Sequence, residues 1–407
     1  MVRKMIDLEE VKRALEKPSP YGPDIDLSRY KIDEGGIIYR EPSQEIIESA
    51  REKVGISVEQ ATYLQVGETV FARAMAEKLF KEYNVVAKPL FKALKEDKLA
   101  EKLAWTLLRP DQDKYTAYAY LYGKEAGYYV YVPPGTKVPL PIYTCLSLFT
   151  ENQVQTTHNI VYLDEGSEAI ITTGCLVPHG VKGGLHVGLS EFYVAEKARL
   201  IYTMIHSWGE GTHVRPRTVV RVKEGGEYVS YYSVYSPVAS IQTYPMVHLE
   251  KKASAKLVSV IAGSGPGVYD IGGGAILEGE GSSAELVSRT ISSKGSRIIS
   301  RSSIEALASG TKGHIECLSV MLDDRSTTET IPVLKTSVEG VELTHEAAIG
   351  MLSGEKLEYL LARGFTEEEA RSILLRGYLT LEVKGIPPSI KAEIDRITDY
   401  VIKHALG

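Results

Sequence analysis

The chain has 407 residues, of which 43% are hydrophobic and 25% charged, and its formal net charge is −6. A negative balance without a dense basic run argues against nucleic acid as a partner. No segment reaches the roughly 18 consecutive apolar residues of a membrane helix. The charged first residues are not followed by the apolar stretch of a secretory signal. We therefore expect a cytoplasmic protein with no nucleic-acid or membrane partner.

The numbers of cysteine and amide side chains indicate the state of the thiols and the kind of source organism. Three cysteines are too few for a disulfide framework, so we expect them to be thiols that serve sulfur chemistry or metal binding. Three Asn and seven Gln are few for this length, whereas Lys and Glu are plentiful. Depletion of heat-labile amides is typical of a thermophilic source.

The first third of the chain is predicted to be helical with irregular connections. Apolar residues recur at three- and four-residue intervals in residues 8–15, 43–54, 71–83 and 87–107, which is the helical period. Between residues 115 and 131 tyrosines accumulate and the period is lost, so no helix is predicted there. Residues 1–114 are assigned to an N-terminal helical region.

From about Tyr128 to Thr344 the pattern changes to short strands and tight turns. A turn that combines charged and small residues recurs at intervals of 31, 28, 27 and 29 residues, at Glu165, Glu196, Glu224, Lys251 and Glu280. A period near 28 indicates stacked coils that share one core, whereas the alternative, a large β-sandwich, would lack this interval. The predicted fold is therefore mainly β, with a right-handed parallel β-helix, or stacked β-solenoid, over residues 115–344.

The helical period returns after Glu346, and residues 345–407 are assigned to a C-terminal helical region. One helix is predicted over residues 354–363, and a Thr366–Glu369 capping box opens a second that runs to about 377. Two prolines at 387–388 start a last helix toward His404. The apolar side chains exceed what two short helices need, which predicts a partner surface made of Leu357, Leu360, Leu361, Ile373, Leu374 and Leu375.

Cys317 carries the clearest chemical signal. His345 and Glu346 follow it by about 28 residues. A thiolate, an imidazole and a carboxylate together are able to hold iron or an iron–sulfur cluster. The alternative is a buried cysteine that packs as a small hydrophobe. On a strand, His345 and Glu346 would face opposite sides, so we rank His345 above Glu346 as a ligand.

Several further residues are candidates. Cys175 is either a sulfur acceptor or a buried turn cysteine, whereas Cys145 lies in an alternating strand and is assigned to the core. His206 and Trp208 share one face of a strand. If that face points inward they line an internal route, and otherwise Trp208 is packing. Three histidines match no compact metal site and are assigned to the surface or to turns: His179, His186 and His213.

Five blocks of the chain resemble the SufB/SufD family, the scaffolds of SUF-type iron–sulfur cluster assembly. They are residues 131–141 at the entry to the β-helix, 173–178 around Cys175, 206–208, Cys317 with His345-Glu346, and 360–370 in the C-terminal helices. Any single block is weak, but five in the family's order over roughly 115–380 are specific. The chain resembles an archaeal or minimal-type SufB.

The resemblance implies a scaffold and not an enzyme. Cys175 would accept sulfur as a persulfide, and His206 and Trp208 would lie along the sulfur route. A transient nascent iron–sulfur cluster would be held at a homodimer interface by Cys317, His345 and Glu346. The implied partners are two copies of a SufC-like ABC ATPase on the C-terminal helices, a sulfur donor and the apo-proteins that receive the cluster. ATP enters only through that ATPase, since this chain lacks a P-loop.

Departures from the family leave the sulfur route open. The family's Phe-Arg-Ile-Asn reads Leu146-Ser147-Leu148-Phe149 here, and His206 replaces a glutamine. Two other functions stay as alternatives. One is a non-catalytic SufD-like partner of the ATPase with a decayed site, against which the intact Cys317 argues. The other is a β-helix carbohydrate-active enzyme, for which the carboxylates of Glu191 and Glu210 are not convincingly grouped.

Overall fold

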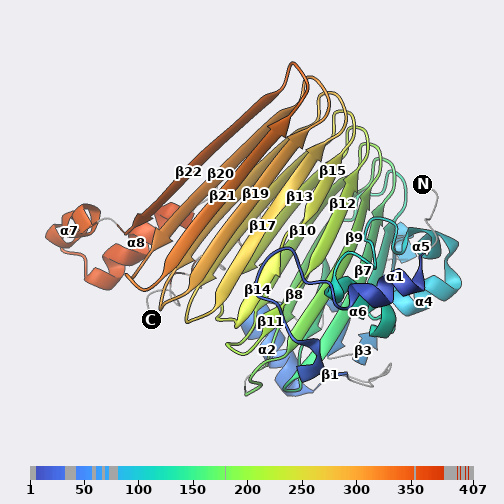
Figure 1. The fold of residues 1–407 in the computed structure, drawn as a ribbon, viewed down its shortest axis with the longest axis horizontal. Helices are drawn as coiled ribbons and strands as arrows, with labels where there is room; N and C mark the ends of the chain where they lie inside the picture. The colour runs from blue at the N-terminus through green and yellow to red at the C-terminus, as the bar shows by residue number, and fades with distance from the viewer. Residues whose placement is uncertain are drawn as a thin grey trace.

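The protein is a parallel β-solenoid with helices at both ends, as the spacing of its turns predicts (Figure 1). The computed structural model describes residues 6–32, 43–56, 61–66, 69–72, 81–178, 180–352 and 354–379, together with positions 392, 395, 399 and 402. The coils contribute strands to two facing sheets, which we call sheet A and sheet B. Most coils add one strand to each sheet, and two coils add a pair of shorter strands to sheet A, namely β11 with β12 and β14 with β15. Neighbouring strands within a sheet come from successive coils, so the chain stacks along one axis.

Sheet B contains the residues of the candidate site. Its strands are hydrogen-bonded in the order β22-β20-β18-β16-β13-β10-β8-β6-β2-β3, and pairing is parallel except between β2 and β3. Their bounds, in chain order, are β2 Ala61–Val66, β3 Thr69–Ala72, β6 Ile142–Ser147, β8 Glu168–Leu176, β10 Arg199–Ser207, β13 Glu227–Val234, β16 Ser254–Gly263, β18 Ser283–Ser292, β20 Lys312–Met321 and β22 Glu342–Met351.

Sheet A faces sheet B across the interior of the solenoid. Its main path runs β11-β14-β17-β15-β12-β9-β7-β5-β4, with β1 beside β7 and with β19 and β21 continuing from β17. The bounds are β1 Lys31–Ile32, β4 Val86–Pro89, β5 Tyr128–Val132, β7 Gln153–Leu163, β9 Leu185–Val194, β11 His213–Val214, β12 Arg217–Val222, β14 Ser240–Thr243, β15 Met246–Leu249, β17 Val268–Leu277, β19 Arg297–Ala306 and β21 Thr327–Thr336.

Turns between the strands explain the sequence period. In successive turns one residue adopts a positive φ, for example Lys197 at 57°, Gly225 at 65° and Lys252 at 55°. The N–H of each donates to a carbonyl in the turn of the next coil, at 3.0 Å from Lys197 to Glu224 and 2.9 Å from Gly225 to Lys251. A residue that tolerates the left-handed region is therefore needed once per coil, which produces the charged-plus-small repeat.

The interior of the solenoid, here called the lumen, is the main hydrophobic core. Alternate side chains of each strand point into it and the intervening ones point outward. Tyr202 of β10 and Trp208, which directly follows this strand, belong to the lumen cluster, whereas Ile201 and Ile205 of β10 belong to a second cluster on the outer face of sheet B. Helix α2 (Gln44–Val54) covers that outer face at one end, and α8 (Glu367–Leu379) covers it at the other.

N-terminal helices lie at the first coils of the solenoid (Figure 1). They are α1 Leu8–Ala14, a 3₁₀ turn at Leu27–Arg29, α2, α4 Leu90–Glu96, α5 Lys98–Leu103 and α6 Lys114–Tyr122. The predictions at residues 8–15 and 43–54 are confirmed. Helix α6 contradicts the prediction that 115–131 holds no helix: residues 114–119 are all buried, whereas Tyr122 in the last turn is exposed, so no amphipathic period arises. Strands β3 and β4 replace the predicted helix at 71–72 and at 87–89, while 73–80 lies outside the described residues.

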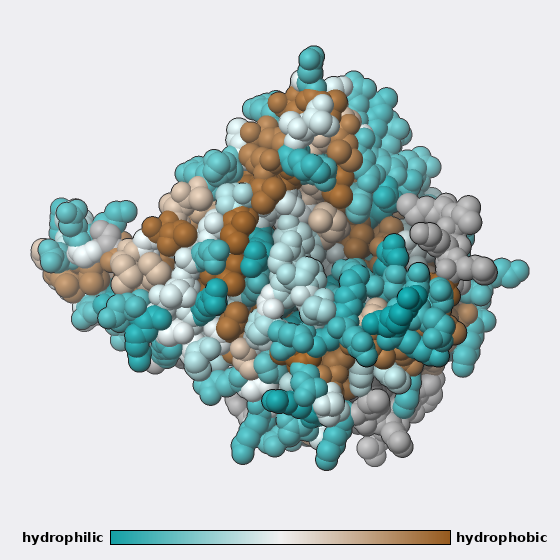
Figure 2. All heavy atoms as spheres, in the orientation of Figure 1, coloured by the Kyte–Doolittle hydropathy of each residue, from teal (hydrophilic) through white to brown (hydrophobic). Residues whose placement is uncertain are grey.

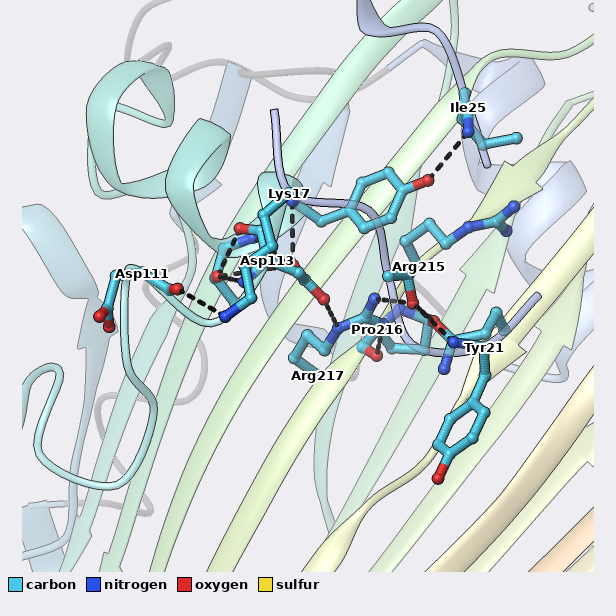
Figure 3. A network of polar contacts seen from close by, with 12 residues as sticks. Lys17, Tyr21, Ile25, Asp111, Asp113, Arg215, Pro216 and Arg217 are labelled. Atoms are coloured by element: carbon cyan, nitrogen blue, oxygen red, sulfur yellow. Dashed lines mark hydrogen bonds and ion pairs between the residues drawn. The ribbon is translucent and has the colours of Figure 1, made fainter. Parts of the chain in front are cut away.

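Residues 17–30 form an N-terminal strap across sheet A. Arg217 Nε donates to Asp113 Oδ2 at 2.8 Å, and both side chains are buried. Figure 3 shows Arg217 facing Asp113, with Lys17 beside Asp111. The Tyr115 hydroxyl accepts from the backbone N–H of Ile25 at 3.2 Å. Polar contacts therefore attach the strap to the helices and to the sheet together.

The strap reaches coils far along the chain. Ser19 Oγ donates to Gln242 at 3.0 Å, and the backbone N–H of Gly22 donates to Asp270 at 3.0 Å. The guanidinium of Arg301, in β19, lies 4.7 Å from the ring centre of Tyr21. The strap thus spans β14, β17 and β19 of sheet A.

Helices α7 (Gly354–Ala362) and α8 follow β22 at the far end of the solenoid (Figure 1). The predicted capping box is confirmed, since the backbone N–H of Thr366 donates to Glu369 at 2.8 Å and that of Glu369 donates to Thr366 at 3.2 Å. Helical structure does not resume directly after Glu346, because β22 continues to Met351. Most of the predicted last helix lies outside the described residues. Within them, no helix is long and apolar enough to cross a membrane.

Candidate functional site

Cys175 and Cys317 both face the lumen. Cys175 lies on β8 and Cys317 on β20, and both side chains belong to the lumen cluster. Cys145, on β6, belongs instead to the outer cluster beneath α2, and its predicted place in the core is confirmed. Five strand spacings along sheet B separate Cys175 from Cys317, which corresponds to about 24 Å. The lumen thus connects two thiols that cannot touch.

Cys175 is sealed inside the lumen. Its side chain is fully buried, and its register partner on β10 is His206. Burial, and then the nearby Cys145 thiol, raise the pKa of Cys175 well above its ordinary value. Behind it, Gly174 faces α2 so closely that a Cβ there would lie 2.5 Å from Val54 Cγ2. Cys175 is therefore held as a neutral thiol in a dry, closely packed place.

Aromatic and imidazole side chains surround Cys175. Trp208 Nε1 donates to His206 Nδ1 at 3.0 Å, and the Tyr232 hydroxyl lies 3.3 Å from the same nitrogen. His186 lies against Trp208 with ring centres 4.9 Å apart and ring planes tilted by 36°. His206 and Trp208 do share an inward face, so of the two alternatives for this pair the inward one is observed.

The assignment of three histidines to the surface or to turns is wrong for His186. This residue is fully buried on β9, where Nδ1 lies 2.9 Å from Gln155 Oε1. Burial lowers its pKa to about 3. His213 is half-buried on β11 beside Ser240, and His179 lies outside the described residues. Sequence spacing failed here because the residues that surround His186 come from other coils.

Cys317 lies one coil from the end of the solenoid. Its exposed fraction is 1%, and its register partner on β18 is Ser288. Burial raises the pKa of Cys317, while hydrogen bonds from Ser302 and Ser300 act in the opposite direction. Hydroxyl groups therefore lie on the lumen side of this thiol, unlike the aromatic rings near Cys175.

His345 and Glu346 both lie on β22, in register with Ile315 and Glu316 of β20. Because Ile315 and Cys317 face the lumen, His345 faces it as well. Glu346 lies on the opposite face beside Glu316, whose carboxylate accepts from Arg289 at 2.6 Å. The expected inclusion of Glu346 in one site with Cys317 needs a turn at this point, and the extended strand does not provide one. In the described part of the chain, no three His, Cys, Asp or Glu side chains gather to hold a metal ion.

The last coil of the solenoid is open. Strand β21 pairs with β19 and β22 pairs with β20, and among the described strands neither has a partner on its other side. Apolar side chains are exposed there, with exposed fractions of 48% for Val333, 45% for Ile349 and 53% for Met351. His345 is exposed in the same coil. An open parallel edge with apolar side chains is a surface on which another chain can add.

A cavity of about 50 Å³ lies in the lumen between the two thiols. At one end it is lined by Tyr202, Met204 and Tyr232, next to the coil of Cys175. At the other end it is lined by Ser288, Ser300 and Ser302, next to Cys317. This volume is enough for one or two water-sized groups.

The carboxylates considered for a carbohydrate-active enzyme do not form a pair. Glu191 is fully buried on sheet A and accepts from the backbone N–H groups of Trp105, Thr106, Leu107 and Leu108 and from His158. This carboxylate anchors the loop after α5 to β9. Glu210 is exposed in a turn. Neither arrangement provides the two facing carboxyl groups that glycoside hydrolysis requires.

The fold and these residues define a class: a β-solenoid that encloses separated thiols and leaves one end open. A family model described as the SufBD core domain of SUF system FeS cluster assembly matches residues 147–378. An iron–sulfur cluster assembly SufBD family protein of Methanothermobacter thermautotrophicus (strain Winter) is 36% identical, over 97% of this chain and 98% of its own length. A SufBD family protein of Archaeoglobus fulgidus is 43% identical over 74% of this chain and 81% of its own length, and SufB of Bacillus subtilis is 27% identical over 89% and 79%. The chain belongs to the SufBD family of iron–sulfur cluster assembly proteins.

Proposed function

We propose that the protein is the scaffold subunit of a SUF-type complex, on which sulfur and iron are combined into a nascent iron–sulfur cluster. One observation carries the proposal. Cys175 and Cys317 face the same lumen, and a cavity lined by hydroxyl groups lies between them. Sulfur accepted at Cys175 would move through the lumen toward Cys317, where iron joins it as a second substrate, and the cavity is one open space between the two positions.

Sulfur enters by exchange between persulfide and thiol. A donor hydropersulfide, R–S–SH, transfers its terminal sulfur to Cys175, which becomes Cys175–S–SH while R–SH leaves. The exchange itself needs no external oxidant or reductant, whereas conversion of the transferred sulfur to the sulfide of a cluster takes two electrons from an external reductant and regenerates the Cys175 thiol. His206 and Trp208 border Cys175 on the lumen side, which suits residues along the sulfur route.

The cluster forms where the solenoid is open. Cys317 and His345 face the lumen of the last two coils, and a thiolate with an imidazole is a ligand set for iron. Two ligands in one chain leave iron incompletely bound. A second copy on the open edge of β21 and β22 supplies the other ligands, so the proposed assembly is a homodimer. Glu346 is on the outer face of the strand and is left out of this ligand set.

The C-terminal helices form the docking surface for a SufC-like ATPase. Tyr359, Leu361, Phe365 and Ile373 are exposed by 59%, 40%, 41% and 43%. Figure 2 shows apolar surface on this projecting region. Leu375 is removed from the docking residues proposed from sequence because it is fully buried against sheet B. Since α8 packs on that sheet behind β18 and β20, force on the helices would reach the Cys317 coil.

Anaerobic reconstitution of the purified full-length protein with ferrous iron and sulfide tests the proposal. The wild-type protein should gain the visible absorbance of a cluster and a defined iron content. Cys317→Ala should fold and lose both, because it removes a ligand and only a small side chain. Cys145→Ala is the matched control, since this buried thiol faces away from the lumen. A Cys317→Ala protein that assembles the same chromophore with the same iron content would refute the site.

A further inference from the structure

Two buried hydrogen-bond donors near Cys175 lack a fully formed hydrogen bond. Among the described residues, His206 Nε2 and the Tyr202 hydroxyl are both buried without a hydrogen bond of full geometry, in side chains exposed by 1% and 3%, although the Tyr202 hydroxyl interacts with Thr173 and with the Tyr128 hydroxyl. A third donor, the Tyr232 hydroxyl, has His206 Nδ1 at 3.3 Å. Unsatisfied buried polar groups are rare and call for an explanation.

All three donors lie on the lumen side of strands near Cys175, and His206 lies directly beside it. His206 is the register partner of Cys175. Met204 of β10 pairs with Thr173 of β8 on one side and with Tyr232 of β13 on the other, so Tyr232 is two strands away from Thr173. Tyr202 lies four residues before His206 on the same face of β10. Burial raises the pKa of Tyr202 and of Tyr232 well above the ordinary value. At Tyr202 the Tyr128 hydroxyl raises the pKa next and Cys175 adds the smallest contribution, whereas at Tyr232 Cys175 is the second cause. The hydroxyl groups are therefore near enough to respond to an anion on this sulfur.

Contacts at His206 determine which of its nitrogens carries the proton. Trp208 Nε1 is a donor only, so His206 Nδ1 accepts its hydrogen bond. Burial, and then His186, lower the pKa of His206 well below 6.5, so the ring is neutral. The single ring proton is then on Nε2, the nitrogen without a partner. His206 thus presents an N–H to the lumen that nothing in the thiol form accepts.

We propose that His206, Tyr202 and Tyr232 form a binding site for the terminal sulfur of a Cys175 persulfide in its anionic form. The inference rests on the proposed role of Cys175 and adds the residues that hold the product. The second sulfur extends into the lumen and carries the negative charge, with lone pairs for several donors. Each donor that is unsatisfied beside the thiol gains a charged acceptor beside the persulfide. The lumen therefore favours the loaded state of Cys175.

The test uses the purified full-length protein and inorganic polysulfide as the sulfur source. Intact-mass and peptide mass spectrometry measure the fraction of Cys175 that carries one added sulfur, and its half-life in dilute small thiol. Thermal unfolding is measured for the thiol form and the loaded form of each protein. The wild-type protein should unfold at a higher temperature when loaded, because the donors then have an acceptor.

Tyr202→Phe removes one donor with little change in shape. Loading of Cys175 at equilibrium should fall by about tenfold, the value of one hydrogen bond to a charged group. Unfolding of the thiol form should occur at the same or a higher temperature, because an unsatisfied buried hydroxyl is gone. A purely structural role for Tyr202 would give the opposite change in the thiol form. His206→Leu should reduce loading similarly, and His206→Gln, which keeps a donor, should restore most of it.

Tyr269→Phe is the matched control. Tyr269 is another fully buried tyrosine of the lumen cluster, but its hydroxyl already reaches the carbonyls of Ser264 and Ser236 at 3.2 and 3.4 Å. Its loss should leave loading unchanged and lower the stability of both forms equally. Equal loading of Cys175 in the wild type, Tyr202→Phe and His206→Leu would overturn the inference and leave Cys175 as the acceptor. Absence of added sulfur on wild-type Cys175 would overturn both.

Discussion

The two ends of the lumen each hold a cysteine, but different groups surround the two thiols. At Cys175 the thiol lies among aromatic rings and imidazoles, and α2 packs tightly behind its strand. At Cys317 the thiol lies beside serine hydroxyls, one coil from an open edge with exposed apolar side chains. A fully buried thiol suits a persulfide that has to be protected from water and from exchange with other thiols. A thiol near an open edge suits a cluster that is shared between chains and then released.

The largest expected effect is at the open end. Replacing both Val333 and Ile349 with Lys places two charges on the unpaired edge, and homodimer formation should weaken by about a hundredfold or more. Analytical ultracentrifugation over a concentration series measures the dissociation constant. Leu307→Lys, at an equally exposed apolar residue in the turn after β19, is the control. A double variant that dimerises like the control would place the interface elsewhere.

Acid should lower the free energy of unfolding through the buried histidines at the Cys175 end of the lumen. Burial lowers the pKa of His186 from 6.5 to about 3. As the pH falls, His186 therefore binds a proton near pH 6.5 in the unfolded chain but only near pH 3 in the folded chain. The contribution of neutral His186 to the free energy of unfolding is fully present above pH 6.5. It is lost as the pH falls toward 3, by up to about 1.4 kcal/mol per pH unit.

Urea unfolding at pH 7 and pH 4.5 checks this dependence. The wild-type protein should lose more stability over this interval than His186→Gln, which carries no titrating ring at this position. Because His206 remains in the variant, part of the acid sensitivity should persist. Equal losses in both proteins would mean that His186 is accessible to protons in the folded state.

A pair of glycine variants compares the ends by packing alone. Gly174→Ala should lower the free energy of unfolding by about 1–3 kcal/mol, because the new methyl group overlaps Val54 and Ile56 of the α2 region. Gly350→Ala, in β22 at the open end, meets nothing within 4 Å and should be neutral or slightly stabilising. Chemical denaturation at neutral pH measures both. Similar losses at both positions would contradict a packing difference between the ends.

The smallest expected effect concerns the docking helices. Phe365→Glu adds a charge to an exposed apolar residue that contributes little to the core, so folding should be unchanged. Affinity for a SufC-like ATPase should fall by about tenfold, measured by calorimetric titration. Leu8→Glu, at an exposed leucine in α1, is the control. Unchanged affinity for Phe365→Glu would exclude the α7–α8 surface as the docking site.

Sequence alone predicts the repeat and the faces of the strands. The interval near 28 residues reports the turns, because each coil needs one residue at positive φ. The opposite faces of His345 and Glu346 follow from strand geometry alone. The helix at 114–122 is missed because residues 114–119 are all buried and show no apolar period.

The surroundings of Cys175 are beyond sequence reasoning for a different reason. His186, Tyr202 and Tyr232 lie 11 to 57 positions from Cys175 along the chain, and they meet it only through the register of β8, β9, β10 and β13. Register depends on how all the coils stack, and a shift of one residue would turn each side chain outward. The tyrosines of β10 and β13 resemble ordinary strand residues until their neighbours are known.

The N-terminal strap also fixes an order of events during synthesis. Tyr21 is made early, yet the guanidinium that covers its ring belongs to Arg301, which follows much later in the chain. At about 5–20 residues synthesised per second, roughly 15 to 60 seconds pass between the synthesis of Tyr21 and that of Arg301. The strap therefore closes last, over coils that have already stacked. A nascent chain whose coils stack out of step would present Gln242 and Asp270 in the wrong places, and the strap would stay undocked.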